Sequence, residues 1–163
     1  MKNMMQLSFT LDEAKNQIHV SREFHGPLSK VWDAWTNPEI LDQWWAPKPW
    51  RARTHSMNFT EGGTWRYAMV GPANEEHWCR ADYSYINTES QYKALDAFTD
   101  PEGNVNNEMP RSNWSVSFNE KDDGTVVNIV ITYPSLDAMK QIIELGFKEG
   151  FTMAMENLDE LLG

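Results

Sequence analysis

Histidine and cysteine, the side chains that most often bind metals or act as bases and nucleophiles, are scarce in this sequence. The histidines are His19, His25, His55 and His77, and only His77 is close to the single cysteine, Cys79. Residues two apart share a face of a β-strand. One histidine and one cysteine are nevertheless too few for a zinc site, which uses about four ligands. We therefore predict no metal site and no cofactor, and we interpret Cys79 as an unreactive strand cysteine.

Recognisable catalytic sequence patterns do not occur either. The Glu-Gly-Gly turn at residues 61–63 lacks the lysine and the following helix of a phosphate-binding loop, and there is no Gly-x-Ser-x-Gly nucleophile elbow. Polar residues that could perform acid–base chemistry do occur within or beside the predicted strands. They are Glu23, His25, Arg66, Asp82 and Asp96. We interpret them as parts of a solvated sheet face and assign no catalytic residue.

The composition limits the classes of function. The net charge of -10, from 24 acidic and 14 basic residues, disfavours binding to nucleic acid or to anionic membranes. No apolar stretch reaches the roughly 18 residues of a membrane span, and residues 1–10 lack the apolar run of a signal peptide. We expect a single cytoplasmic domain over residues 1–163 that does not insert into membranes. The 8 Trp and 9 Met residues suit either an aromatic core or a pocket for apolar ligands.

The positions of apolar residues predict the elements that would carry such a pocket. Residues 7–11 and 18–24 are expected to form two strands joined by a polar turn. Residues 28–35 have apolar side chains at helical spacing, and Asn37 and Pro38 end this helix and begin a second one that runs to about residue 45. Further strands are expected at residues 52–59, 64–70, 78–86, 92–98, 114–118 and 126–133.

The C-terminal part of the chain predicts one long amphipathic helix. Ser135 suits the N-cap, and apolar residues then recur every three or four positions for roughly seven turns. Gly146 and Gly150 lie inside this helix, where each costs about 1 kcal/mol relative to alanine. We expect that they allow either close packing on the sheet or space for a ligand beneath the helix. The polar loop at residues 100–111 is expected to be a mobile flap.

Several ordered segments of the chain resemble one known family. These segments are residues 31–39 (VWDAWTNPE), 44–47 (WWAP), 61–67 (EGGTWRY), 98–104 (FTDPEGN) and 146–151 (GFKEGF). The family is that of the activator of the ninety-kilodalton heat-shock chaperone's ATPase, specifically its C-terminal-domain-like proteins, in the START-like (SRPBCC) helix-grip superfamily. The chain departs from the family pattern at Phe151, where tryptophan is usual, and at Ala81, where glycine is usual. Both differences affect the expected size of the pocket and leave the expected fold unchanged.

The resemblance implies an α+β helix-grip fold, which agrees with the separation of strands and helices along the chain. In that fold a curved antiparallel sheet wraps around a long C-terminal helix, two short helices follow the first strand, and a cavity lies between sheet and helix. Strand alternation and the helix stripe then predict the residues that line the cavity, with Trp45 at its entrance. The predicted lining residues are Trp65, Tyr67, Met69, Tyr83, Leu95, Ala97, Trp114, Val116, Phe118, Ile143, Phe147, Phe151 and Met155.

These observations favour a non-catalytic binding module for a small apolar or aromatic ligand. A chaperone-associated or stress-response role in protein interactions is the first alternative, because an acidic surface suits a basic partner. The second alternative is an enzyme of cyclase, hydratase or hydrolase type, which requires at least two titratable side chains that converge in the cavity. The sequence is compatible with a monomer or a homodimer, and it does not name the ligand.

Overall fold

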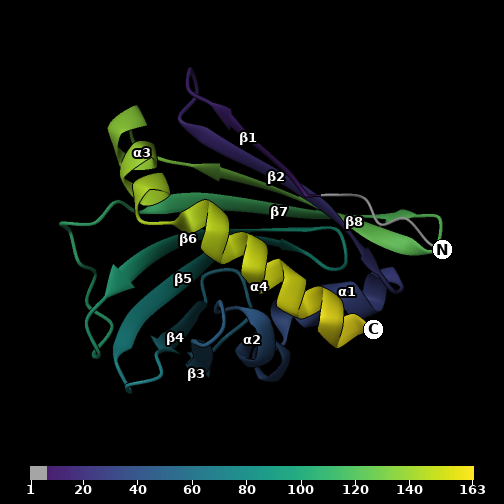
Figure 1. Cartoon of the computed structure of the whole chain (residues 1–163), viewed down its shortest axis with the longest axis horizontal. Coiled ribbons are helices and arrows are strands. Elements are labelled where there is room, and N and C mark those ends of the chain that lie inside the picture. The colour runs from purple at the N-terminus through teal and green to yellow at the C-terminus, as the bar shows by residue number, and fades with distance from the viewer. Residues whose placement is uncertain (1–6) are drawn as a thin grey trace.

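The computed structural model describes residues 7–163, and its largest element is one antiparallel sheet of eight strands (Figure 1). The order across the sheet is β1-β2-β8-β7-β6-β5-β4-β3. The strands are β1 (Ser8–Asp12), β2 (Gln17–His25), β3 (Arg51–Met57), β4 (Thr64–Val70), β5 (Glu76–Asn87), β6 (Gln91–Thr99), β7 (Ser112–Lys121) and β8 (Gly124–Thr132). The consecutive strands from β3 to β8 are neighbours in the sheet, and the return to β2 brings the N-terminal strands alongside β8.

The sheet is curved, and all of the helices lie on its concave side (Figure 1). The pairing register shifts between Thr54 and Ser56 on β3 and between Tyr83 and Tyr85 on β5. Such irregularities bend a strand and increase its local twist. The bend gives the sheet a hollow inner surface that the helices cover only in part.

Two short helices, α1 (Leu28–Thr36) and α2 (Pro38–Trp44), follow β2 and cover one end of the concave face. The family resemblance implied that these helices follow the first strand, but they follow the second. The reason is that β1 is an additional edge strand, which pairs with β2. Asn37 begins α2 as predicted, because its side-chain oxygen accepts a hydrogen bond from the backbone N–H of Glu39 at 3.0 Å and Pro38 occupies the first turn.

The C-terminal helix is shorter than the predicted single helix, because the segment is divided into α3 (Leu136–Glu144) and α4 (Phe147–Leu162). Ser135 caps α3 as predicted, by accepting a hydrogen bond from the N–H of Ala138 at 3.0 Å. Gly146 has a φ of +94°, a left-handed conformation that glycine adopts without steric cost. The periodic apolar stripe continues across this break, so periodicity alone did not reveal it.

The solid part of the core lies beneath α1 and α2. Trp35 and Trp44 pack edge to face with ring centroids 4.8 Å apart, and Trp32 packs against Phe118 at 5.0 Å. Arg22 on β2 fixes α4 above this core by donating a hydrogen bond to the backbone oxygen of Met155 at 2.6 Å. The large indole rings pack this end of the space between sheet and α4, whereas a cavity lies toward the start of α4.

The loop at residues 100–111 is tied to the convex face of the sheet by arginines. Arg66 donates a hydrogen bond to the backbone oxygen of Pro101 at 2.8 Å, and Arg80 donates one to that of Gly103 at 3.1 Å. Arg111 forms an ion pair with Asp82 at 2.7 Å. These contacts give the loop a defined place beside the sheet, where sequence alone suggested a flap. Within residues 7–163, none of the helices has the length and apolar character that crossing a membrane requires.

Candidate ligand-binding cavity

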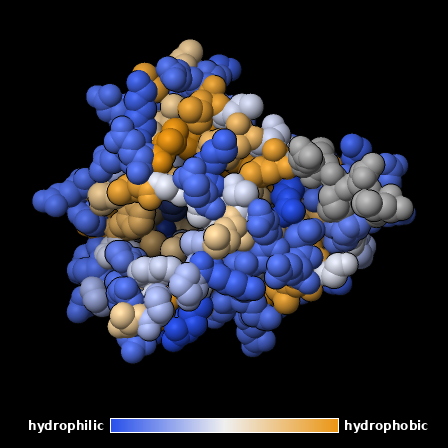
Figure 2. Space-filling model, viewed as in Figure 1, coloured by the Kyte–Doolittle hydropathy of each residue, from blue (hydrophilic) through white to orange (hydrophobic). Residues whose placement is uncertain are grey.

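A cavity of about 400 Å³ lies between the junction of α3 with α4 and the strands β4 to β7. In Figure 2 the surface is hollowed beside the start of α4, next to hydrophobic residues of the two C-terminal helices. Leu145 stands at this junction with 65% of its surface exposed. The cavity is lined by Trp45, Pro47, Tyr67, Met69, His77, Cys79, Asp96, Ala97, Phe98, Pro110, Ser112, Trp114, Tyr133, Ile142, Leu145, Gly146, Phe147, Gly150 and Phe151.

Aromatic rings form a continuous wall of this cavity. Trp114 on β7 packs against Trp45 at 5.8 Å and against Phe151 at 5.5 Å between ring centroids. Phe147 and Phe151, one turn apart on α4, are stacked at 5.3 Å. The rings come from three different parts of the chain and hold one another in place. A flat, apolar molecule would therefore meet ring faces and edges whose positions are already fixed.

Asp96 on β6 is the carboxylate of the cavity, and it is held by β7. Its Oδ1 accepts hydrogen bonds from the Ser112 backbone N–H at 3.0 Å and from the Ser112 hydroxyl at 2.6 Å. Its Oδ2 accepts one from the indole N–H of Trp114 at 3.1 Å. Burial nevertheless raises the pKa of Asp96 above its ordinary value, because desolvation outweighs the hydrogen bonds that favour the charged form.

Three further titratable groups of the cavity, Tyr67, Cys79 and Tyr133, are held in their protonated forms. Tyr67 accepts a hydrogen bond from the indole N–H of Trp45 at 3.1 Å, and burial raises the pKa of Tyr67 well above its ordinary value. Burial also raises the pKa of the Cys79 thiol to about 12 and raises the pKa of Tyr133. At neutral pH these three groups are therefore uncharged polar contacts, and Cys79 is unsuited to act as a nucleophile.

The cavity includes part of the lining predicted from sequence. Trp45 borders it, as do six of the thirteen predicted lining residues: Tyr67, Met69, Ala97, Trp114, Phe147 and Phe151. The other seven, which do not border it, are Trp65, Tyr83, Leu95, Val116, Phe118, Ile143 and Met155. Of these, five are buried in the core: Trp65, Tyr83, Val116, Phe118 and Met155. They face the concave side, but aromatic packing has filled the space around them, as where Tyr83 meets Phe59 at 4.8 Å.

Leu95 and Ile143 do not line the cavity because their side chains point away from it. Across the sheet Asp96 pairs with Ala81 and Ser112, whereas Leu95 pairs with Asp82 and Asn113. Because directly paired residues share a face, the Asp96 row is concave and the Leu95 row is convex. On α3 it is Ile142, rather than Ile143, that lines the cavity. Asp96, interpreted from sequence as part of a solvated sheet face, therefore lies on the concave face instead.

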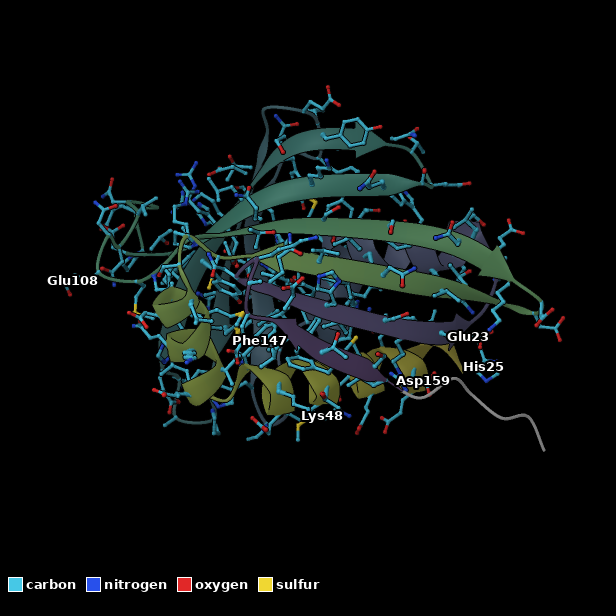
Figure 3. The ribbon with its side chains drawn as sticks, turned by 90° about the horizontal axis from the view of Figure 1, so that it is seen from above. Glu23, His25, Lys48, Glu108, Phe147 and Asp159 are labelled. Carbon is cyan, nitrogen blue, oxygen red and sulfur yellow. The ribbon has the colours of Figure 1, made fainter. Side chains whose placement is uncertain are left out.

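The remaining polar candidates from sequence are not in the cavity. Asp82 and Arg66 belong to the convex network that holds the loop at residues 100–111. Glu23 and His25 lie near one end of the molecule, well apart from Phe147, which borders the cavity (Figure 3). Across residues 7–163 the structure brings together no group of three or more His, Cys, Asp or Glu side chains that could hold a metal ion.

A curved antiparallel sheet closed by a C-terminal helix over a cavity defines the START-like helix-grip fold. Residues 25–163 match the model of the family described as activator of Hsp90 ATPase homolog 1-like protein, and the chain belongs to this family. The resemblance predicted from the ordered segments is thus confirmed. Among curated proteins, no sequence matches this chain.

Solved structures of bacterial proteins agree in fold. A protein from Mycobacterium smegmatis is 27% identical with a TM-score of 0.89, over 99% of this chain and 98% of the other. A protein from Arthrobacter aurescens is also 27% identical with a TM-score of 0.90, over 95% and 90% of the two chains. One from Staphylococcus epidermidis is 29% identical with a TM-score of 0.82, over 94% and 93%. The likeness extends over nearly the whole chain, so it includes the elements that surround the cavity.

Proposed function

We propose that this protein binds a small, largely apolar ligand with an aromatic body in the cavity under the start of α4. The observation that carries the proposal is the combination of about 400 Å³ of space with a wall of fixed aromatic rings and one polar cluster. Sites for small molecules have volumes of roughly 300–1,000 Å³, mostly apolar linings and a few convergent polar groups. A ligand of this class would place its rings along Trp45, Trp114 and Phe151 and direct a polar atom toward Asp96.

Binding is favoured over catalysis by the protonation states in the cavity. Titratable groups do converge there, which is the first requirement of the enzyme hypothesis. However, the raised pKa values of Tyr67, Cys79 and Tyr133 leave these groups uncharged at neutral pH. Asp96 and His77 are then the candidates for a base in the cavity lining, and the Oδ1 of Asp96 is already occupied by Ser112. This set is better suited to orienting a ligand than to activating a nucleophile.

Gly150 offers a direct test of where the ligand binds. It lines the cavity, and a Cβ added there would meet only Pro47 Cγ, at 3.7 Å. We expect Gly150→Ala to retain binding and to stabilise the fold by up to about 1 kcal/mol, because alanine suits a helix better than glycine. Gly150→Leu is expected to weaken binding by at least about tenfold, because its larger side chain takes up space that the ligand needs.

The measurement is quenching of tryptophan fluorescence by naphthylmethanol, a neutral aromatic probe, with the thermal unfolding midpoint recorded for each variant. Gly150→Ala serves as the matched control, since it alters the same helix position without filling the cavity. Equal affinities for the wild type, Gly150→Ala and Gly150→Leu would place the probe elsewhere and contradict the proposal. Failure of the wild type to bind the probe would also count against it and would favour the protein-interaction role that the family description suggests.

A further inference from the structure

The charges that face the cavity are asymmetric. Among the described residues, its lining includes one carboxylate, Asp96, one histidine, His77, and no lysine or arginine. Arg111 is the cation whose charge acts to lower the pKa of Asp96. Its guanidinium, however, is already bound to other groups. Its guanidinium donates to Asp82 Oδ2 at 2.7 Å and to the backbone oxygen of Asp96 at 3.2 Å. The carboxylate is therefore buried without an ion-pair partner among the described residues, a situation that costs free energy.

Asp96 also retains capacity to accept a further hydrogen bond. Two carboxylate oxygens together offer about four acceptor positions, and three donors from Ser112 and Trp114 reach them in the structure. Two of these donors meet Oδ1, so the remaining capacity is mainly at Oδ2, beside the indole of Trp114. A ligand that donates a hydrogen bond can complete this set, whereas a ligand with a carboxylate would place a second carboxyl group in a desolvated site.

The aromatic wall adds a second attraction for positive charge. A cation within about 6 Å of a ring face interacts favourably with the ring, most strongly with tryptophan. Trp114 both donates to Asp96 and packs against Trp45 and Phe147. A positive group that reaches Asp96 Oδ2 would thus lie next to this indole.

We infer that the cavity selects ligands that carry a cationic nitrogen, of the arylalkyl-ammonium class, and that Asp96 is the residue that determines this selectivity. The inference rests on the proposed function, since the cavity must first accept an aromatic body. The ammonium group would donate a charge-assisted hydrogen bond to Asp96 Oδ2, and the rings of the ligand would lie along Trp114 and Phe151. Neutral ligands with a hydroxyl group would bind less tightly, and anionic ones least.

Three probes with the same ring system separate these possibilities: naphthylmethylamine, naphthylmethanol and naphthoate. Calorimetric titration at neutral pH is expected to give the amine an affinity at least about tenfold above that of the alcohol, and naphthoate the weakest binding of the three. In Asp96→Asn the preference for the amine should fall several-fold, to the part that the aromatic rings provide, while the alcohol still binds. Glu156→Gln is the charge-matched control, because Glu156 is exposed on α4 and its replacement should leave the ranking unchanged.

The outcomes distinguish this inference from the proposed function. Equal binding of the amine and the alcohol, or an amine preference that is undiminished in Asp96→Asn, would overturn the role of Asp96 while leaving the binding cavity intact. If Asp96→Asn does not fold, as judged by its circular dichroism melt, the wild-type ranking decides, and tightest binding of naphthoate overturns the inference. Absence of binding by all three probes would overturn the proposed function itself.

Discussion

Iodoacetamide should alkylate Cys79 in the folded protein on the order of fiftyfold more slowly than in the unfolded protein at pH 8. Burial raises the pKa of Cys79 from 9.0 to about 12, which lowers the thiolate fraction about a thousandfold. A thiolate of higher pKa is intrinsically more nucleophilic, which recovers roughly twentyfold. The 7% exposure of Cys79 restricts access and slows the reaction further.

The pH profile and a control cysteine complete this experiment. The rate for folded protein should keep rising between pH 8 and pH 10 without a plateau, because the pKa of Cys79 is raised to about 12. Ser84→Cys in a Cys79→Ser background places a thiol at an exposed position of the same strand and should react at nearly the unfolded rate. A plateau near pH 8 in the native protein would show that Cys79 has a lowered pKa and would reopen its role as a nucleophile.

Replacing Trp44 with alanine should lower the free energy of unfolding by about 3–5 kcal/mol. Trp44 is 0% exposed and joins Trp35 to Trp45 through ring contacts at 4.8 and 5.3 Å. Its indole N–H donates to the backbone oxygen of Ala34 at 2.9 Å, which ties α2 to α1. The alanine variant loses both the packing and this bond, and chemical denaturation followed by far-ultraviolet circular dichroism measures the loss.

Two matched variants separate packing from hydrogen bonding. Trp44→Phe keeps most of the ring and loses the bond to Ala34, whereas Trp35→Phe removes a buried indole N–H that has no partner among the described residues. Trp44→Phe should therefore be the more destabilising of the two, because an unpaired buried acceptor costs about 1–3 kcal/mol. Equal losses would contradict this assignment, as would a loss below about 1 kcal/mol in Trp44→Ala.

The fold could be predicted from sequence because its strands and short helices carry strong local signals. Alternation placed β4 at Thr64–Val70 as observed, and Asn37 with Pro38 correctly marked the start of α2. The division of the C-terminal segment at Gly146 could not be predicted in the same way. Glycine is tolerated within helices at modest cost, so the left-handed conformation that separates α3 from α4 follows from tertiary packing.

The cavity was harder to predict because it depends on strand facing and on how much volume the core fills. Tyr67 and Trp114, which alternation selected, border the cavity, as does Ala97 on β6. Leu95 does not border it, and Asp96 was not among the predicted lining residues. The alternation of Tyr92, Ala94 and Asp96 along β6 was the available signal for the inward facing of Asp96. A strand's sequence indicates at best which side chains share a face of the sheet. The volume that the packed tryptophans leave free is known only from the structure.

The central claim is that the cavity under α4 binds a small aromatic ligand, and the indole N–H resonances of the protein report on it directly. The indole N–H of Trp45 bonds to Tyr67 and that of Trp114 bonds to Asp96, both within the cavity. Trp78, whose indole N–H bonds to Glu76, is not among the lining residues. Titration of nitrogen-labelled protein with naphthylmethanol should shift the Trp45 and Trp114 resonances saturably and leave Trp78 unchanged. Saturable shifts confined to other tryptophans, or none at all, would contradict the claim.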